Sequence, residues 1–273
     1  MNLDHQLPMT LKQYIQLLYF PLIQAALFAL LVYINSFSIL SLLVLFLSAF
    51  ALNFCLHITV HHAVHFISGK TYYTLPVGIM LSWLIGIPFH YYSMSHWNHH
   101  RHNNEIQDFT STWRKDKNGS LAPKSFWLYV LFWPFMSNTG LLEQFSTSKV
   151  EGYNSRRNEI FVLIEVIMNV FFYWLLIEVS WWVFAAYIIM VYVGWCFISA
   201  HNFGQHIPEN YGAHKGYSYY AGWYNRIFVN NGLHEEHHVT PHVTYWNLNT
   251  NEKGAEVNQP HLLVGLSHKS AQK

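Results

Sequence analysis

The sequence has few charged residues and almost no cysteine. Of its 273 residues, 11% are Asp, Glu, Lys or Arg, whereas a soluble globular protein carries about 25%. This deficit indicates that much of the surface does not face water. The two cysteines, Cys55 and Cys196, lie in apolar runs and provide neither a disulfide framework nor a cysteine-based metal motif. The formal net charge is +1, so bulk electrostatics predicts no nucleic-acid partner.

Four apolar segments are long enough to cross a bilayer, which takes about 20 residues or as few as about 17. They are residues 17–34, 39–60, 160–177 and 181–200. The short links 35–38 and 178–180 join them in pairs, which predicts two transmembrane hairpins. Two further apolar stretches, 75–91 and 126–136, contain proline. We interpret both as interfacial or re-entrant helices; the alternative is that each spans the membrane.

The two short links contain no lysine or arginine. All 15 such residues lie before the first span, between the two pairs of spans or after the fourth span. Because positive residues favour the cytoplasmic side, both termini are expected there. The sequence thus predicts an all-α integral membrane protein, one domain over residues 1–273, with two hairpins, interfacial helices and a cytoplasmic histidine-rich cap. Residues 248–273 are polar and are expected to form a loosely ordered tail.

Histidine is abundant, with 19 residues, and most of them occur in clusters. Within three clusters the spacing of three or four residues places the side chains on one face of a helix. These clusters contain His61 and His65; His96, His99 and His100; and His234, His237 and His238. A further histidine, His201, follows the fourth span. The predicted topology brings all of them to one boundary of the membrane.

So many imidazoles predict a metal centre. Imidazole suits Zn, Cu, Fe and Ni, and nine imidazoles exceed the four ligands of one tetrahedral zinc, so two metal ions are the economical interpretation. Carboxylates are expected to accept hydrogen bonds from the outer ring nitrogens, and the candidates are Glu105, Asp108, Glu235 and Glu236. His57 and His62 are alternative ligands in the first cluster, and His102, His206 and His242 are candidates for an outer role. The remaining five, His5, His90, His214, His261 and His268, are interpreted as ordinary polar residues.

One carboxylate, Glu165, lies inside the third span with Asn169 nearby. An ionisable residue within the membrane is a functional candidate, here one that lines a cavity. The alternative is a structural partner for aromatic hydroxyl or N–H groups.

The three clusters, written HxxxH, HxxHH and HxxHH, resemble the histidine boxes of the membrane fatty acid desaturase superfamily. The resemblance covers about residues 17–248, including His201 in its Ser-Ala-His-Asn-Phe-Gly context and Pro241 and Trp246 after the last box. It implies two Fe ions, O₂ as the oxidant and a hydrophobic tunnel that leads to the metals. The ligands it implies are His61, His65, His96, His99, His100, His201, His234, His237 and His238. One departure is His62, which stands where many relatives carry an acidic residue.

The resemblance favours a fatty acyl desaturase that acts on a lipid-like substrate. The segments around His96 and Pro241 are also similar to carotenoid ketolases, so a hydroxylase or ketolase of an acyl chain, carotenoid or other hydrophobic molecule is the alternative. Electrons are expected from a separate ferredoxin, rubredoxin or cytochrome b5 type protein. A metal transporter is a remote alternative, because transporters place their ligands near the bilayer midplane rather than at one boundary.

Overall fold

The structure is a computed structural model and describes residues 10–66, 74–108, 110–111, 125–135, 156–207, 216–250 and 255–267. In this part of the chain, four helices are long and apolar enough to cross a membrane: Leu11–Ile34, Ile39–Phe66, Arg156–Val179 and Trp181–Gln205. The first is α1, the third is α7 and the fourth is α8. The second is a continuous run of three elements: α2 (Ile39–Phe54), the π-helix η1 (Cys55–Val60) and α3 (His61–Phe66). By length and composition, the four predicted spans are confirmed.

Short links with capping side chains join these helices in pairs. Asn35 ends α1 in the left-handed conformation, with φ 41°, and the Ser38 side chain then accepts from the Ser41 N–H to start α2. The Ser180 side chain starts α8 by accepting from the Val183 N–H. The two links also meet, since Ser180 Oγ lies 2.5 Å from Asn35 Oδ1. This contact supports the prediction that both links lie on the same side of the membrane.

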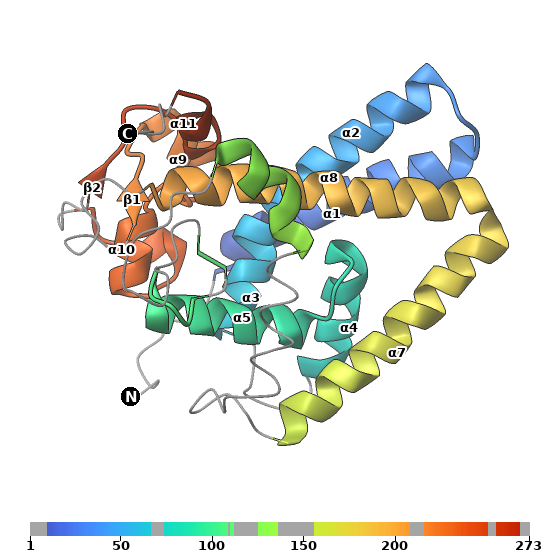
Figure 1. Ribbon diagram of the computed structural model, residues 1–273, viewed down its shortest axis with the longest axis horizontal. Helices are drawn as coiled ribbons and strands as arrows, with labels where there is room; N and C mark the ends of the chain where they lie inside the picture. The colour runs from blue at the N-terminus through green and yellow to red at the C-terminus, as the bar shows by residue number, and fades with distance from the viewer. Residues whose placement is uncertain are drawn as a thin grey trace.

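The interior is built mainly by α2 and α8, which pack along each other (Figure 1). A Cβ at Gly194 would lie 2.6 Å from the Leu52 side chain and 3.1 Å from the Ala49 carbonyl oxygen. Glycine therefore lets the two helix backbones approach closely, as small residues do in membrane helix pairs. Large apolar side chains remain exposed along α1, α2 and α7, among them Leu22, Leu43, Leu163, Ile167 and Val170. Because so much apolar surface requires a non-aqueous neighbour, the protein is a membrane protein.

The predicted apolar stretch 75–91 is not one straight helix. It holds the end of α4 (Thr74–Ile85) and the start of α5 (Phe89–His102), which meet at an angle of 85°. Gly86, with φ +77°, and Pro88 lie at this break. The Ser82 hydroxyl bridges it by accepting from the Phe89 N–H at 2.8 Å. The bend is compatible with a broken span or with a re-entrant segment, and it directs the histidine-bearing α5 toward the C-terminal elements (Figure 1). The second predicted stretch contains the helix Phe126–Phe135.

A fully buried pair anchors the start of α5 to α7. Glu165 Oε1 lies 2.6 Å from His90 Nδ1, and Glu165 Oε2 accepts from the His90 backbone N–H at 2.9 Å. Gly78 makes room for the pair, because a Cβ there would collide with Glu165 Oε1. The sequence interpretation of His90 as an ordinary polar or interfacial histidine gave no sign of this partner, which lies on α7, 75 positions away in the sequence.

The C-terminal elements pack at the end of α8 that carries His201 (Figure 1). They are β1 (Tyr217–Ser218), α9 (Gly222–Ile227), α10 (His234–Val239), the 3₁₀ turn η2 (Tyr245–Asn247), β2 (Ala255–Glu256) and α11 (His261–Ser267). The two strands pair in parallel, and α11 contacts α8 so closely that a Cβ at Gly204 would collide with the His261 carbonyl. Val257 and Val264 are buried. The expected loose tail is thus wrong for residues 255–267, because these apolar side chains find a surface that the sequence alone does not reveal.

Candidate metal centre

Five histidines from three helices converge on one point. Their ligand nitrogens lie within 4.8 Å of one another, and the residues are His61, His65, His96, His100 and His237. His96 Nε2 is 3.0 Å from His65 Nε2 and 2.9 Å from His100 Nε2, which is 3.0 Å from His237 Nε2. A neutral imidazole has one N–H to share, so these facing nitrogens cannot all pair with one another. The arrangement suits a cation that accepts several lone pairs at once.

A second group lies beside the first. It contains His99, His206 and His238, whose ligand nitrogens also lie within 4.8 Å of one another. His206 Nε2 is 3.1 Å from His99 Nε2 and 2.8 Å from His234 Nε2, so His234 adjoins this group. The rings of His100 and His238 have centroids 4.3 Å apart, which makes the two groups immediate neighbours.

Local helix geometry explains how the sequence presents these side chains. The first group takes two histidines from α3, two from α5 and one from α10, at the helical spacings read from the sequence. The π-helix η1 directly precedes His61 and widens the helix there, as π-helical turns often do near functional sites. His206 follows the last residue of α8 as its C-cap, with φ −131° and ψ 47°. This departure from helical geometry lets it point at α5 and α10.

The ring nitrogens have the chemistry of metal ligands. Burial, followed by neighbouring imidazoles, lowers the pKa of His237 to about 3 and the pKa values of His206 and His238 well below their ordinary value. These rings are therefore neutral at pH 7 and offer lone pairs. Some buried ring nitrogens of the centre have no hydrogen-bond partner among the described residues. Among them are both ring nitrogens of His238 and the Nε2 of His61. Buried nitrogens without partners are costly unless they bind an ion, so the residues fit a metal centre.

Two outer contacts fix the orientation of the rings. Asp108 Oδ2 lies 2.8 Å from His99 Nδ1, and the hydroxyl of Tyr245 contacts His61 Nδ1. Burial alone would raise the pKa of Asp108. Its interaction with His99 and hydrogen bonds from Asn104 and Thr110 nevertheless lower that pKa overall, so the carboxylate stays charged. Each outer contact at Nδ1 leaves the opposite nitrogen, Nε2, directed at the centre.

Asp108→Asn should weaken metal binding at the second group by about 10- to 100-fold, the usual effect of losing an outer partner of a ligating histidine. The amide has no charge and can present an N–H to His99 in place of an acceptor. Metal retained per chain during titration with a chelator measures the effect. Glu105→Gln is the matched control because Glu105 is exposed. Equal metal retention in Asp108→Asn and wild type would contradict the role of this carboxylate.

Several expected site residues lie elsewhere. His201 joins neither group of described histidines: its Nε2 is 2.7 Å from the Tyr224 hydroxyl, and its ring centroid is 4.2 Å from that of His57. His62 stacks on Phe66 with ring centroids 4.3 Å apart. His57 and His62, the alternative ligands considered for the first cluster, belong to neither group of described histidines.

The candidate carboxylates also separate. Glu236 accepts hydrogen bonds from Ser218 Oγ at 2.5 Å and from the Tyr220 hydroxyl at 2.7 Å, so it holds β1 against α10 and not a histidine ring. Glu105 is exposed. His5, His214 and His268 lie outside the described residues. Among the carboxylates proposed from the sequence, Asp108 contacts a histidine of the centre, His99.

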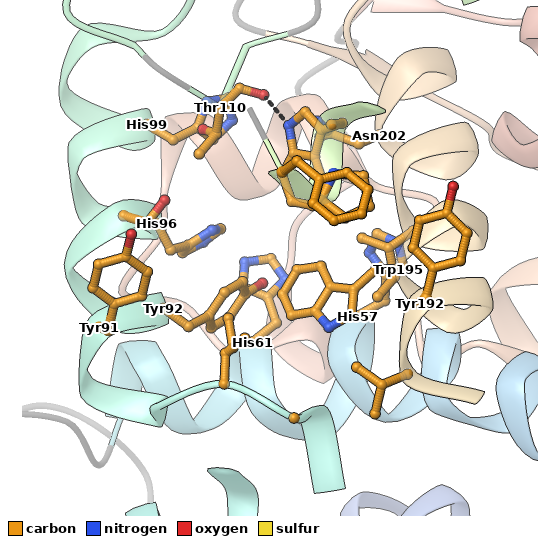
Figure 2. A pocket seen from close by; sticks show the side chains of 18 of the residues that line it. His57, His61, Tyr91, Tyr92, His96, His99, Thr110, Tyr192, Trp195 and Asn202 are labelled. Carbon is orange, nitrogen blue, oxygen red and sulfur yellow. Dashed lines mark hydrogen bonds between the residues drawn. The ribbon is translucent and has the colours of Figure 1, made fainter. Parts of the chain in front are cut away.

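An apolar cavity of about 430 Å³ reaches the centre. His61, His96, His99 and His234 lie at one end of its lining. Figure 2 shows His96 and His99 on one wall, with Tyr91 and Tyr92, and Trp195, Tyr192 and Asn202 opposite them. Glu165 and Asn169 do not belong to its described lining, so the expectation that they line a cavity does not hold for this one.

Comparison with known proteins agrees with the histidine geometry. Neither the curated proteins nor the solved structures gave a match to the chain. The model of the fatty acid desaturase family matches residues 36–258, which include both histidine groups and the whole of three of the four apolar helices. The match extends over most of the sequence, and the chain therefore belongs to the fatty acid desaturase family.

Proposed function

We propose that the protein is an O₂-dependent di-iron oxidoreductase that acts on unactivated C–H bonds of a lipid-like substrate. The observation that carries this proposal is the pair of adjacent, largely buried histidine groups at the end of an apolar cavity, in a member of the fatty acid desaturase family. One tetrahedral zinc would use four ligands, whereas eight imidazoles form two separate groups here. Two metal positions account for all of them.

The proposed ligands of the first iron are His61, His65, His96, His100 and His237. Those of the second are His99, His206 and His238, with His234 close enough to join them. This set keeps eight of the nine histidines predicted from the sequence and substitutes His206 for His201. The substitution is supported by the place of His201, which belongs to neither group and has its Nε2 against the Tyr224 hydroxyl.

When bound, the irons would supply O₂ activation: two electrons and two protons, with two hydrogens from the substrate, reduce O₂ to two waters and leave a carbon–carbon double bond. Hydroxylation would instead place one oxygen atom in the substrate and one in water. The chain itself holds the imidazoles, excludes water with an aromatic cavity wall and positions one carbon. Positioning decides the product, because a displacement of about 1 Å can change the rate by about 100-fold.

The substrate proposed from the sequence is a fatty acyl chain, with a hydroxylase or ketolase reaction as the alternative product outcome. We propose that the electrons come from a separate ferredoxin, rubredoxin or cytochrome b5 type protein. We also propose that the centre and both termini face the cytoplasm. The contact between Asn35 and Ser180 supports this orientation, since it keeps together the two links that lack lysine and arginine.

The test is metal content combined with product formation. We expect the protein, purified in detergent from iron-supplemented cells, to hold about two irons per chain. His237→Ala should lose iron, and lipid extracts of expressing cells should gain an oxidised product that depends on O₂ and is missing with the variant. One zinc per chain, or iron content unaffected by His237→Ala, would overturn the di-iron oxidoreductase.

A further inference from the structure

The cavity follows one face of α8 for most of the helix. Its lining residues on α8 run from Tyr187 to Gln205, and those that recur every three or four positions share one side: Val191, Trp195, Ile198, Asn202 and Gln205. Tyr187 lines its far end, and the distance from Tyr187 to Gln205 along the axis is about 27 Å at 1.5 Å per residue. A volume of about 430 Å³ spread over that length makes the cavity long and narrow. Such a shape suits a single extended chain better than a broad, compact molecule.

The cavity is exposed at the end away from the histidines. At the metal end, His61, Gln205 and His234 are each at most 5% exposed. At the other end, Ile188 is 40% and Ile189 46% exposed. Tyr187 at this end is buried, so the exposed apolar surface there is that of Ile188 and Ile189. We therefore identify this apolar end as the mouth.

Two tyrosines hold the edges of this mouth. The Tyr192 hydroxyl donates to the Leu131 carbonyl at 3.1 Å, which ties α8 to the helix Phe126–Phe135. The Tyr173 hydroxyl donates to the Gly86 carbonyl at 2.8 Å, which ties α7 to the bend between α4 and α5. Both bonds connect helices that the links do not join. The mouth is therefore framed by fixed contacts between separate helices.

The mouth opens within the membrane. Ile188 lies within an apolar span, about 11 Å along the axis from its start at Trp181 and about 26 Å from Gln205. No Lys, Arg, Asp or Glu belongs to the described lining of the cavity. A charged headgroup left at this depth would lose its hydration without gaining a partner, and such burial is strongly unfavourable.

We infer that the guest of this cavity is a linear, uncharged lipid that enters sideways from the hydrocarbon core of the bilayer, past Ile188 and Ile189, and lies along α8 with one end at the histidines. This guest is a substrate only if the proposed function holds. The inference selects against an acyl chain that is attached to a charged carrier or to a phospholipid headgroup when it enters. It also makes Ile188 a residue that determines access.

Photolabelling in phosphatidylcholine nanodiscs tests this inference. Three probes carry a diazirine at the same chain position: a long-chain alcohol, a phosphatidylcholine and an acyl-coenzyme A. Mass spectrometry then compares labelling of Ser95 and Ile198, which line the cavity and are at most 5% exposed, with labelling of the exposed Ile167 on α7. We expect the alcohol to label Ser95 and Ile198, and the two charged probes to leave both unlabelled.

Ile188→Trp should lower labelling of Ser95 and Ile198 by the alcohol by about tenfold or more, because an indole overfills a narrow passage. Val170→Trp is the control, since Val170 is exposed on α7 and outside the described lining. Ile189→Trp replaces Ile188→Trp if that variant does not fold. Equal labelling of Ser95 by a charged probe, or unchanged labelling in both mouth variants, would overturn the inference.

This labelling requires neither iron nor turnover. A protein that takes up the alcohol but binds no iron would overturn the proposed function and support the access route. A protein that holds iron but admits the phospholipid probe would overturn the access route alone.

Discussion

His206→Ala should empty one of the two proposed iron positions, whereas His201→Ala should leave both filled. His206 Nε2 faces His99 Nε2 at 3.1 Å and His234 Nε2 at 2.8 Å, at the centre of the second group. His201 is directed at Tyr224 instead. Removing an outer partner already weakens metal binding by about 10- to 100-fold, and we expect the loss of a ligand to reach at least the upper end of that range.

Iron per chain, and the Mössbauer spectrum of ⁵⁷Fe-loaded protein, measure this difference. We expect His206→Ala to retain about half of the iron, in one type of site, because the first group keeps its five imidazoles. Both variants are compared only as monodisperse fractions from size exclusion, since both side chains are buried. Iron lost from His201→Ala and retained by His206→Ala would restore the ligand set predicted from the sequence.

The choice between His201 and His206 shows where sequence reasoning reached its limit. Box spacing predicts which histidines share a helix face, but it does not predict that the histidines of α5 and of α10 divide between the two groups. His206 stands where α8 ends and leaves helical geometry, so helical periodicity does not predict its direction. From the sequence, His206 is therefore only a candidate for an outer role.

The spans illustrate a second limit. Hydropathy predicted the second span to end at residue 60, whereas the helix continues to Phe66 through His61 and His65. A polar residue normally marks the end of an apolar span, but these histidines face the protein interior and not lipid. The same reason extends α8 to Gln205. Apolar run length therefore underestimates a membrane helix wherever its polar residues build a buried site.

The pair formed by Glu165 and His90 could not be predicted from the sequence, because it depends on how α5 and α7 pack. Each residue was interpreted alone, Glu165 as a candidate for a cavity and His90 as an ordinary histidine. Their contact also explains Gly78, where any Cβ would displace the carboxylate. A glycine, a histidine and a glutamate from three helices thus form one unit that becomes visible only in the packed structure.

Glu165→Ala should destabilise the protein by about 3–5 kcal/mol, the usual effect of removing one partner from a buried, hydrogen-bonded pair. Both side chains are fully buried, and the carboxylate also accepts the His90 backbone N–H in the first turn of α5. This helix carries His96, His99 and His100, which belong to both histidine groups. We therefore expect the variant to lose iron from both positions, as well as thermal stability.

The melting temperature in detergent and iron per chain measure the two effects. Glu159→Ala is the matched control, because Glu159 lies on the same helix and is exposed. Glu165→Gln keeps one acceptor oxygen and should recover part of both losses, since the amide can still bond the start of α5. A Glu165→Ala protein that melts and binds iron like Glu159→Ala would show that α5 is positioned without this pair. If Glu165→Ala loses stability but keeps all its iron, the pair holds α7 against the bundle and has no part in positioning the metal centre.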